Sequence, residues 1–217
     1  MLASPSFSVP RALVVAFVLA TPAAPGGPEP PPPQEAVVYA VGQAPPRLAA
    51  GVGEAGAAMV ALQRRLSARL LQEVRAGGLA QAIAVCRDEA PALTAETVRE
   101  GGVRVGRTSH RLRNPRNTAP AWAERLVAAG ADRKAASVET AVVDLGDRVG
   151  VLRPIPTLAM CLRCHGPVED LSSEVKTFLA RAYPSDRAVA FEEGDLRGFA
   201  WAEAPVATGA PSQAPPR

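Results

Sequence analysis

The chain has 217 residues, and its 24 Lys and Arg against 21 Asp and Glu give a formal net charge of only +3. Aromatic residues make up 4 % of the sequence, with two Tyr and five Phe. This weak positive charge and the shortage of stacking side chains argue against a nucleic-acid-binding protein. A chain so poor in large aromatic side chains gains from burying a flat apolar cofactor, which is permissive of a cofactor-binding domain without identifying the cofactor.

Residues 1–23 have the pattern of an export signal. Arg11 precedes an apolar run from Ala12 to Ala20, and small residues with proline follow it. The run is well short of the ~20 residues that a membrane span needs, so a signal peptide is favoured over an uncleaved anchor. Residues 24–35 are a proline-rich linker. We therefore expect a periplasmic or secreted protein with no stable membrane span after removal of the signal.

The folded part is expected to be one domain, residues 36–205, because a segment of this size supplies one hydrophobic core and no second. The sequence after it, residues 206–217, is again rich in proline and small residues and is predicted to be a disordered tail. Within the domain, apolar residues recur every three or four positions between residues 53 and 75, which predicts a long amphipathic helix near the N-terminus. Gly77 and Gly78 should end this helix.

Further helices and a strand follow in the first half of the domain. Residues 79–91 are predicted to form a second, short helix with Cys86 on its buried face, and residues 93–100 one or two further turns. The sequence VRVGR at residues 103–107 is strand-like. A polar loop broken by proline comes next, and residues 119–130 are again helical.

The second half is richer in strands. Residues 137–145 and 148–155 predict a β-hairpin joined by a Gly-Asp turn. A loop with two cysteines follows, and then a helix from its expected N-cap Asp170 through Tyr183. Residues 196–204 predict the last strand. This order of elements predicts an α+β fold, in which helices flank an antiparallel sheet.

The sequence MCLRCHG at residues 160–166 places Cys161, Cys164 and His165 within five positions of a chain that has only three cysteines and two histidines. C-x-x-C-H is the covalent attachment pattern of c-type haem. The two thiols add to the two vinyl groups of the porphyrin, and the imidazole that follows lies under the iron. Export fits this interpretation, because such attachment is made outside the cytoplasm. One covalent haem c is therefore the expected cofactor.

Other uses of the cysteine pair fit less well. A thioredoxin-like site needs a helix that begins at the first cysteine, whereas Gly166 and Pro167 break a helix just after the pair. A structural zinc would need a fourth ligand beyond the three motif residues, and Cys86 could supply it. A disulfide across two residues would be strained. A zinc-binding structural module therefore stays as an alternative of lower rank.

The motif does not fix the ligand on the other face of the iron. The candidates are Met59, Met160, His110 and Cys86, or the position is open. Met160 adjoins the attachment loop and cannot easily reach round, and His110 lies in an arginine-rich loop where a surface or propionate-side place is expected. Cys86 lies on an apolar helical face, where a small core residue is an equally good explanation. The choice stays open at this level.

Four stretches in a fixed order extend the pattern over residues 55–204: VCRDEAP, GGVRVGRTSHRLRNPRN, CLRCHG and YPSDRAVAFEEGDLRG. Together they resemble the monohaem c-type haem-binding PAS-like sensor domain family, formerly a domain of unknown function. Its members stand alone in exported proteins or form the outer part of bacterial sensor kinases and cyclases. The most specific stretch is R-T-S-x-x-x-R-N-P-x-N, from Arg107 to Asn117.

This resemblance implies a PAS-like fold and an iron held by His165 and by a cysteine from an early helix, which is Cys86. One departure is Ala190, where relatives more often have glycine, and it affects the geometry of one turn. The arginines around this stretch are explained equally well by a solvated basic loop and by contacts to the haem propionates. Arg107 and Arg113 are the candidates for propionate contacts, because a guanidinium matches a carboxylate bidentately. Other residues are interpreted as structural: Tyr183, Asp186, Asp195 and Arg197 in turns, and Trp122 and Trp201 in the core.

A six-coordinate iron leaves no position for a substrate, so no enzyme is expected, and a haem peroxidase ranks low. A thiolate opposite an imidazole favours ferric iron and a low potential. Redox or small-ligand sensing is the function that the family implies, and soluble periplasmic electron transfer ranks level with it on this chain. Either function would need a separate redox or signalling protein as partner.

Overall fold

Five strands form one antiparallel sheet in the computed structural model, which describes residues 36–206. The order across the sheet is β1-β3-β4-β5-β2. The strands are β1 (Val37–Ala40), β2 (Arg104–Thr108), β3 (Ala141–Asp144), β4 (Arg148–Pro156) and β5 (Leu196–Pro205). The predicted signal (1–23), the predicted linker (24–35) and all but the first residue of the predicted tail lie outside the described residues.

Helices connect the strands, and the longest helical region lies between β1 and β2. The helices are α1 (Ala49–Ala84), α2 (Ala90–Gly101), α3 (Glu124–Ala129), α4 (Leu162–His165) and α5 (Ser173–Ala182), with a π-helical turn at Val85–Glu89 between α1 and α2. Single 3-10 turns lie at Val41–Gln43, Pro46–Leu48, Ala121–Ala123, Ala135–Ser137, Ala159–Cys161 and Val168–Asp170. The predicted α+β fold is confirmed, with its antiparallel sheet, its flanking helices and its long N-terminal helix.

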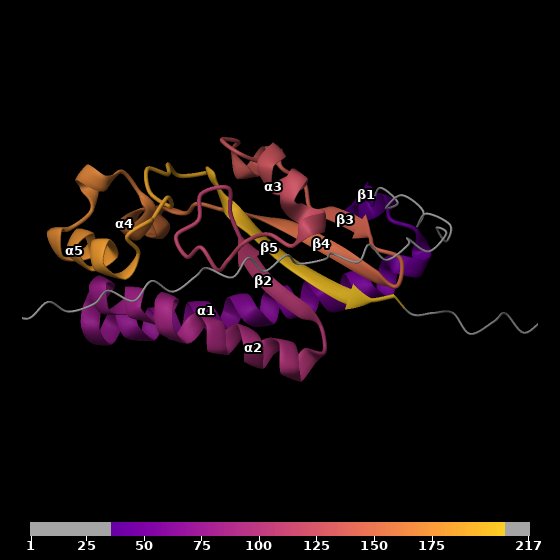
Figure 1. Ribbon diagram of the computed structural model, residues 1–217, viewed down its shortest axis with the longest axis horizontal. Helices are drawn as coiled ribbons and strands as arrows, with labels where there is room; N and C mark the ends of the chain where they lie inside the picture. The colour runs from indigo at the N-terminus through magenta and orange to yellow at the C-terminus, as the bar shows by residue number, and fades with distance from the viewer. Residues whose placement is uncertain (1–35, 207–217) are drawn as a thin grey trace, which may run out of the picture. The chain divides into compact units, whose positions relative to one another are not determined.

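The first long helix reverses direction at Gly78, whose φ of 82° and ψ of −175° are not helical. Two helical arms result, and they lie side by side, from indigo to magenta (Figure 1). The second arm continues through the π-helical turn into α2. Ion pairs tie the arms together, Arg69 with Glu89 at 2.7 Å and Arg65 with Glu100. The prediction that the glycine pair ends the first helix is confirmed, because only glycine adopts this conformation without strain.

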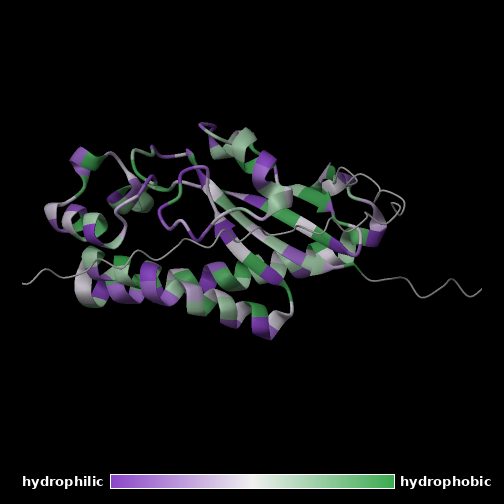
Figure 2. Cartoon of the chain, viewed as in Figure 1, coloured by the Kyte–Doolittle hydropathy of each residue, from purple (hydrophilic) through white to green (hydrophobic). Residues whose placement is uncertain are grey.

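The first arm of α1 packs on one face of the sheet. Its residues Met59 and Leu62 are 3 % and 2 % exposed and share a cluster with Val149 and Val151 of β4. A Cβ at Gly51 would lie 2.7 Å from the Val149 side chain, so the helix can approach the sheet this closely only with glycine there. The helices show alternating apolar and hydrophilic patches, as amphipathic helices do (Figure 2).

A second cluster lies around α3, which covers the other side of the sheet (Figure 1). Trp122 packs over Gly150, and Trp201 packs over Gly106. The indole nitrogen of Trp122 donates a 3.0 Å hydrogen bond to the carboxylate of Glu203, which is buried. Both tryptophans therefore act as packing residues, as the sequence indicated.

Three local expectations need correction. The N-cap of α5 is Ser172, whose Oγ accepts from the Val175 amide, and not Asp170, which ends a 3-10 turn before it. Strand β3 is shorter than predicted, because the chain first forms the 3-10 turn Ala135–Ser137. Strand β1 was not predicted, since four residues carry almost no periodic signal and its pairing with β3 is a tertiary contact. The hairpin between β3 and β4 is confirmed.

None of the helices within residues 36–206 combines the length and the apolar character needed to cross a membrane.

Candidate functional site

The two motif cysteines lie on a short loop that returns the chain from β4 to α5. Cys161 ends a 3-10 turn, and Cys164 and His165 belong to α4. Gly166 then leaves the helical conformation, as predicted, and a Cβ there would lie 2.7 Å from the carbonyl oxygen of Leu162. Both cysteines are free thiols and half-buried.

The imidazole of His165 is held in one neutral tautomer, with the proton on Nδ1. Its Nδ1 lies 2.7 Å from the carbonyl oxygen of Ala188, and only a protonated Nδ1 can donate to that oxygen. The lone pair of Nε2 is then left for an acceptor role, which is the arrangement seen for metal-bound histidines. Burial lowers the pKa of His165 well below its usual range, and the nearby Arg197 and Arg113 lower it further.

Cys86 belongs to a different part of the chain from the C-x-x-C-H loop. It lies in the π-helical turn between α1 and α2, and such turns are often found at functional sites. Burial raises the pKa of the Cys86 thiol, while the guanidinium of Arg107 opposes this rise more than any other charge. The pKa of Cys164 is raised chiefly by burial, and the nearby Cys86 raises it further, against the opposing charge of Arg113.

A small apolar cluster holds these two segments together. Ile83, one helical turn before Cys86, packs with residues of α5, and Cys164 lies against the same cluster. The fold therefore brings the early-helix cysteine close to the C-x-x-C-H loop, which the family resemblance implied and the residues alone left open.

Arg113 is fully engaged in holding this loop. Its Nε donates to Asp186 at 2.8 Å, and its Nη2 donates to the carbonyl oxygens of Cys164 at 2.6 Å and Ala188 at 3.0 Å. The side chains of Arg113 and Asp186 are 10 % and 11 % exposed. Because Ala188 is also the acceptor for His165, this one guanidinium fixes both the cysteine loop and the partner of the histidine.

Arg107 and Arg197 are positioned differently. Both are half-buried, and burial lowers the pKa of both, that of Arg197 to about 10. Within residues 36–206, the Arg107 guanidinium has no hydrogen bond or ion pair. The Nη2 of Arg197 lies 3.5 Å from Nε2 of His165, and its Nη1 lies 3.4 Å from Oγ of Ser109.

Of the other candidate iron ligands, the two methionines lie away from His165, whereas His110 packs on the same phenylalanine ring as His165. Met59 belongs to the core between α1 and the sheet, and Met160 is 56 % exposed. His110 approaches the buried ring of Phe191 edge-on, as His165 also does. Within residues 36–206, neither ring nitrogen of His110 has a hydrogen-bond partner, and burial lowers its pKa. His110 is half-buried and packs against Phe191, and the expected surface or propionate-side place stays a prediction.

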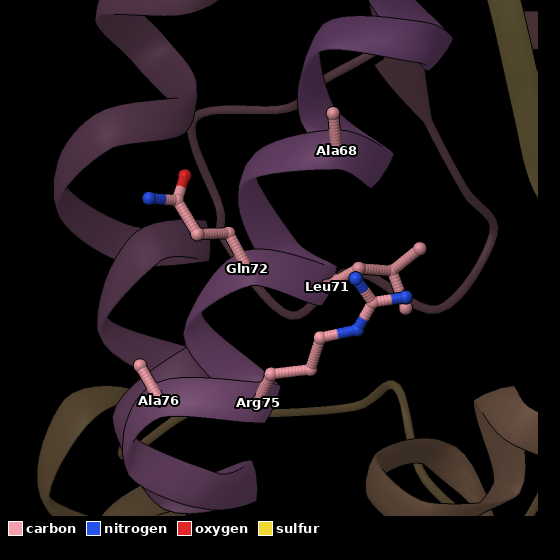
Figure 3. Close-up of a pocket in the computed structure, with 5 residues that line it drawn as sticks. All are labelled: Ala68, Leu71, Gln72, Arg75 and Ala76. Atoms are coloured by element: carbon pink, nitrogen blue, oxygen red, sulfur yellow. The ribbon is translucent and has the colours of Figure 1, made fainter.

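Two shallow hollows in the surface do not coincide with this site. One follows the outer face of α1 (Figure 3), where it is lined by Ala68, Leu71, Gln72, Arg75 and Ala76. The other lies between the second helical arm and α5, and neither contains a cysteine or a histidine. Among the described residues, no three His, Cys, Asp or Glu side chains gather as a metal cluster requires, so no preformed Cys3His zinc site is present.

Two residues make contacts at this site that the sequence analysis did not anticipate. Asp186 and Arg197 were interpreted as structural turn residues; Asp186 does accept from the Ala188 amide, and it also anchors Arg113, while Arg197 approaches His165. Arg197 stands between apolar residues in a predicted strand, and a charged residue in a half-buried strand is a signal that could have identified it.

The fold is a helix-flanked antiparallel-sheet domain, in which an apolar cluster joins the end of the first long helix to the C-x-x-C-H loop and α5. The chain belongs to the Tll0287-like family, whose model matches residues 47–205. A similar solved structure is that of the cyanobacterial heme-protein Tll0287, with 22 % identity and a TM-score of 0.52, covering 77 % of this chain and all of that one. No curated protein sequence matches the chain significantly.

Proposed function

We propose that this chain binds one haem c covalently through Cys161 and Cys164, with His165 and Cys86 as axial ligands, and acts in redox or small-ligand sensing outside the cytoplasm. The observation that carries the proposal is the state of His165. A neutral imidazole with Nδ1–H bound to Ala188, directly after a C-x-x-C pair, presents its Nε2 as a ligand for iron. The fold neighbour described as a heme-protein supports the same cofactor.

The remaining residues fit this group. Cys86 and Arg107 provide a thiol with a guanidinium beside it, and the positive charge favours the thiolate that would bind iron. When bound, the haem supplies one-electron chemistry and a binding position for small gases. The chain contributes the two thiols of the attachment, a fixed imidazole, and a loop held in place by Arg113.

The position of Cys86 supports the sensing proposal. The π-helical turn that carries it links α1 to α2, so a change in what Cys86 binds would act on the joint between two long helical segments. Cys86 would hold the iron from this turn, and its release would alter the helical surface that a separate signalling partner contacts.

Electron transfer is the second candidate, and one observation favours it. The attachment loop lies at the surface, where Leu158 and Met160 are 52 % and 56 % exposed. An edge of the cofactor beside these residues would be accessible to a redox partner. The proposed absence of enzymatic activity applies to both functions, and a peroxidase activity above that of free haem would contradict both.

The test is an optical and electron paramagnetic resonance spectrum of the protein matured in a bacterial periplasm, first oxidised and then reduced under carbon monoxide. Haem that resists acid-acetone extraction, with a low-spin thiolate-type ferric signal, is the expected result. Ready binding of carbon monoxide after reduction would favour sensing, and no binding would favour electron transfer. A chain that carries zinc and no haem would overturn the proposal.

A further inference from the structure

The lone pair on Nε2 of His165 can either accept a hydrogen bond from Arg197 or bind iron, and it cannot do both. The Nδ1 proton is committed to Ala188, so Nε2 has a single lone pair in the ring plane. In the structure, Nη2 of Arg197 lies 3.5 Å from that atom. A nitrogen that accepts from a guanidinium cannot bind iron with the same electron pair, so Arg197 must release Nε2 when the cofactor enters.

The charged groups around Arg197 indicate what its guanidinium would bind after it releases Nε2 of His165. After burial, the guanidinium groups of Arg113 and Arg107 are the largest causes that lower the pKa of Arg197 in this half-buried region. The carboxylate of Asp186 is the acidic group that acts on Arg197, and it is already bound by Arg113 and by the Ala188 amide. Arg107 and Arg197 therefore carry positive charge without a paired carboxylate in the described part of the chain.

Such charges are costly to bury unless an anion accompanies them. Arginine is also the residue best suited to bind a carboxylate through two parallel hydrogen bonds. Haem brings two propionate carboxylates, and these lie on the edge opposite to the vinyl groups that the cysteines attack. The guanidinium side chains of Arg107 and Arg197 come from β2 and β5, separate from the attachment loop.

We propose that Arg197 holds Nε2 of His165 in the haem-free chain and, once haem enters, pairs with a propionate beside Arg107. Arg113, in contrast, stays with Asp186 and positions the loop. This assignment rests on the proposed function, because it requires haem as the ligand. It replaces Arg113 by Arg197 as the second propionate-binding arginine.

The test compares ferric haem with its dimethyl ester, which has the same porphyrin but no carboxylates. The chain without its signal is produced free of haem and titrated with each compound, and binding is followed by the Soret band. The original chain should bind haem more tightly than the ester by roughly ten-fold or more, as expected for a charge-assisted pair. Arg197→Gln should lose most of this preference, and Arg197→Lys should keep an intermediate part of it.

Arg181→Gln is the matched control, since Arg181 is exposed on α5, and it should keep the full preference. Circular dichroism shows whether each variant is folded. If Arg197→Gln does not fold, the preference for haem over the ester is compared between Arg197→Lys and the original chain. A folded Arg197 variant with the original preference for haem over the ester would overturn the assignment and leave the proposed function intact. Failure of the original chain to bind either compound would overturn both.

Discussion

The guanidinium of Arg113 donates a 2.6 Å hydrogen bond to the carbonyl oxygen of Cys164, 51 positions further along the chain. The same side chain reaches Asp186 and Ala188, and Ala188 is the acceptor for His165. The geometry of the C-x-x-C-H loop thus depends on a residue of the arginine-rich segment after β2. The arginine-rich stretch and the C-x-x-C-H stretch of the sequence are therefore parts of one structural unit.

Arg113→Gln should destabilise the fold by roughly 3 kcal/mol, because it leaves the Asp186 carboxylate buried without its partner. Urea unfolding of the haem-free chain measures this change. Arg87→Gln is the control, since the Arg87–Asp88 pair has side chains 44 % and 53 % exposed and should contribute nothing measurable. Equal stability of the two variants would show that the Arg113 network is not structural.

Cys86→Ala should leave haem covalently attached and convert the ferric spectrum to high spin or to that of a new ligand. The reason is that, in the proposed function, Cys161 and Cys164 would make the covalent bonds, while Cys86 would provide only an iron ligand. Optical and electron paramagnetic resonance spectra of the oxidised protein report this change. The double variant Cys161→Ala with Cys164→Ala should retain no haem after acid-acetone extraction. An unchanged Cys86→Ala spectrum would remove Cys86 from the iron.

Ala190→Gly should stabilise the protein by roughly 1 kcal/mol. Ala190 has a φ of 56°, a left-handed conformation in which a Cβ is strained. Its amide donates a 2.9 Å hydrogen bond to the carbonyl oxygen of Gly166, so the strained turn supports the end of the C-x-x-C-H loop. Ala180→Gly on the exposed face of α5 should have the opposite sign, by about 1 kcal/mol, because glycine is unfavourable within a helix. Thermal unfolding of the pair compares the two; a loss of stability in both variants would show that the left-handed turn costs nothing.

His110→Gln should make the haem-free protein less sensitive to acid. Burial, helped by the charge of Arg111, lowers the pKa of His110, so the folded chain takes up the proton less readily than the unfolded chain. Stability is therefore lost as the pH falls below the ordinary histidine pKa of about 6.5, toward the lower value of the folded state. His165 has a lowered pKa too and contributes to the same loss.

Urea unfolding at neutral pH and at about pH 5, one to two units below the ordinary histidine pKa, measures this effect. The difference in stability between the two conditions should be smaller for His110→Gln than for the original chain. The matched variant His165→Gln should reduce the difference as well. An unchanged pH dependence in His110→Gln would show that the imidazole is protonated as easily in the folded chain as in the unfolded one.

Much of the fold was predictable because its signals are local. The apolar spacing in α1, the glycine pair that reverses the helix and the turn between β3 and β4 each involve neighbouring residues, and each prediction is confirmed. Errors arose where two local signals competed. Asp170 and Ser172 are both good N-caps, and the 3-10 turn that contains Asp170 decides for Ser172.

The chain belongs to the Tll0287-like family over residues 47–205, the region that also contains the four sequence stretches. Export, covalent haem attachment and sensing stay predictions. By itself, the sequence determined the α+β class, the helical reversal and the C-x-x-C-H loop, because periodicity and turn chemistry act over a few residues. Only the tertiary structure decided that Cys86 approaches that loop, that Arg113 is committed to Asp186, and that Arg197 faces His165. The paired residues are 78, 73 and 32 positions apart along the chain, and their approach is set by how the sheet and the helical arms pack, because no local sequence signal reaches over such separations.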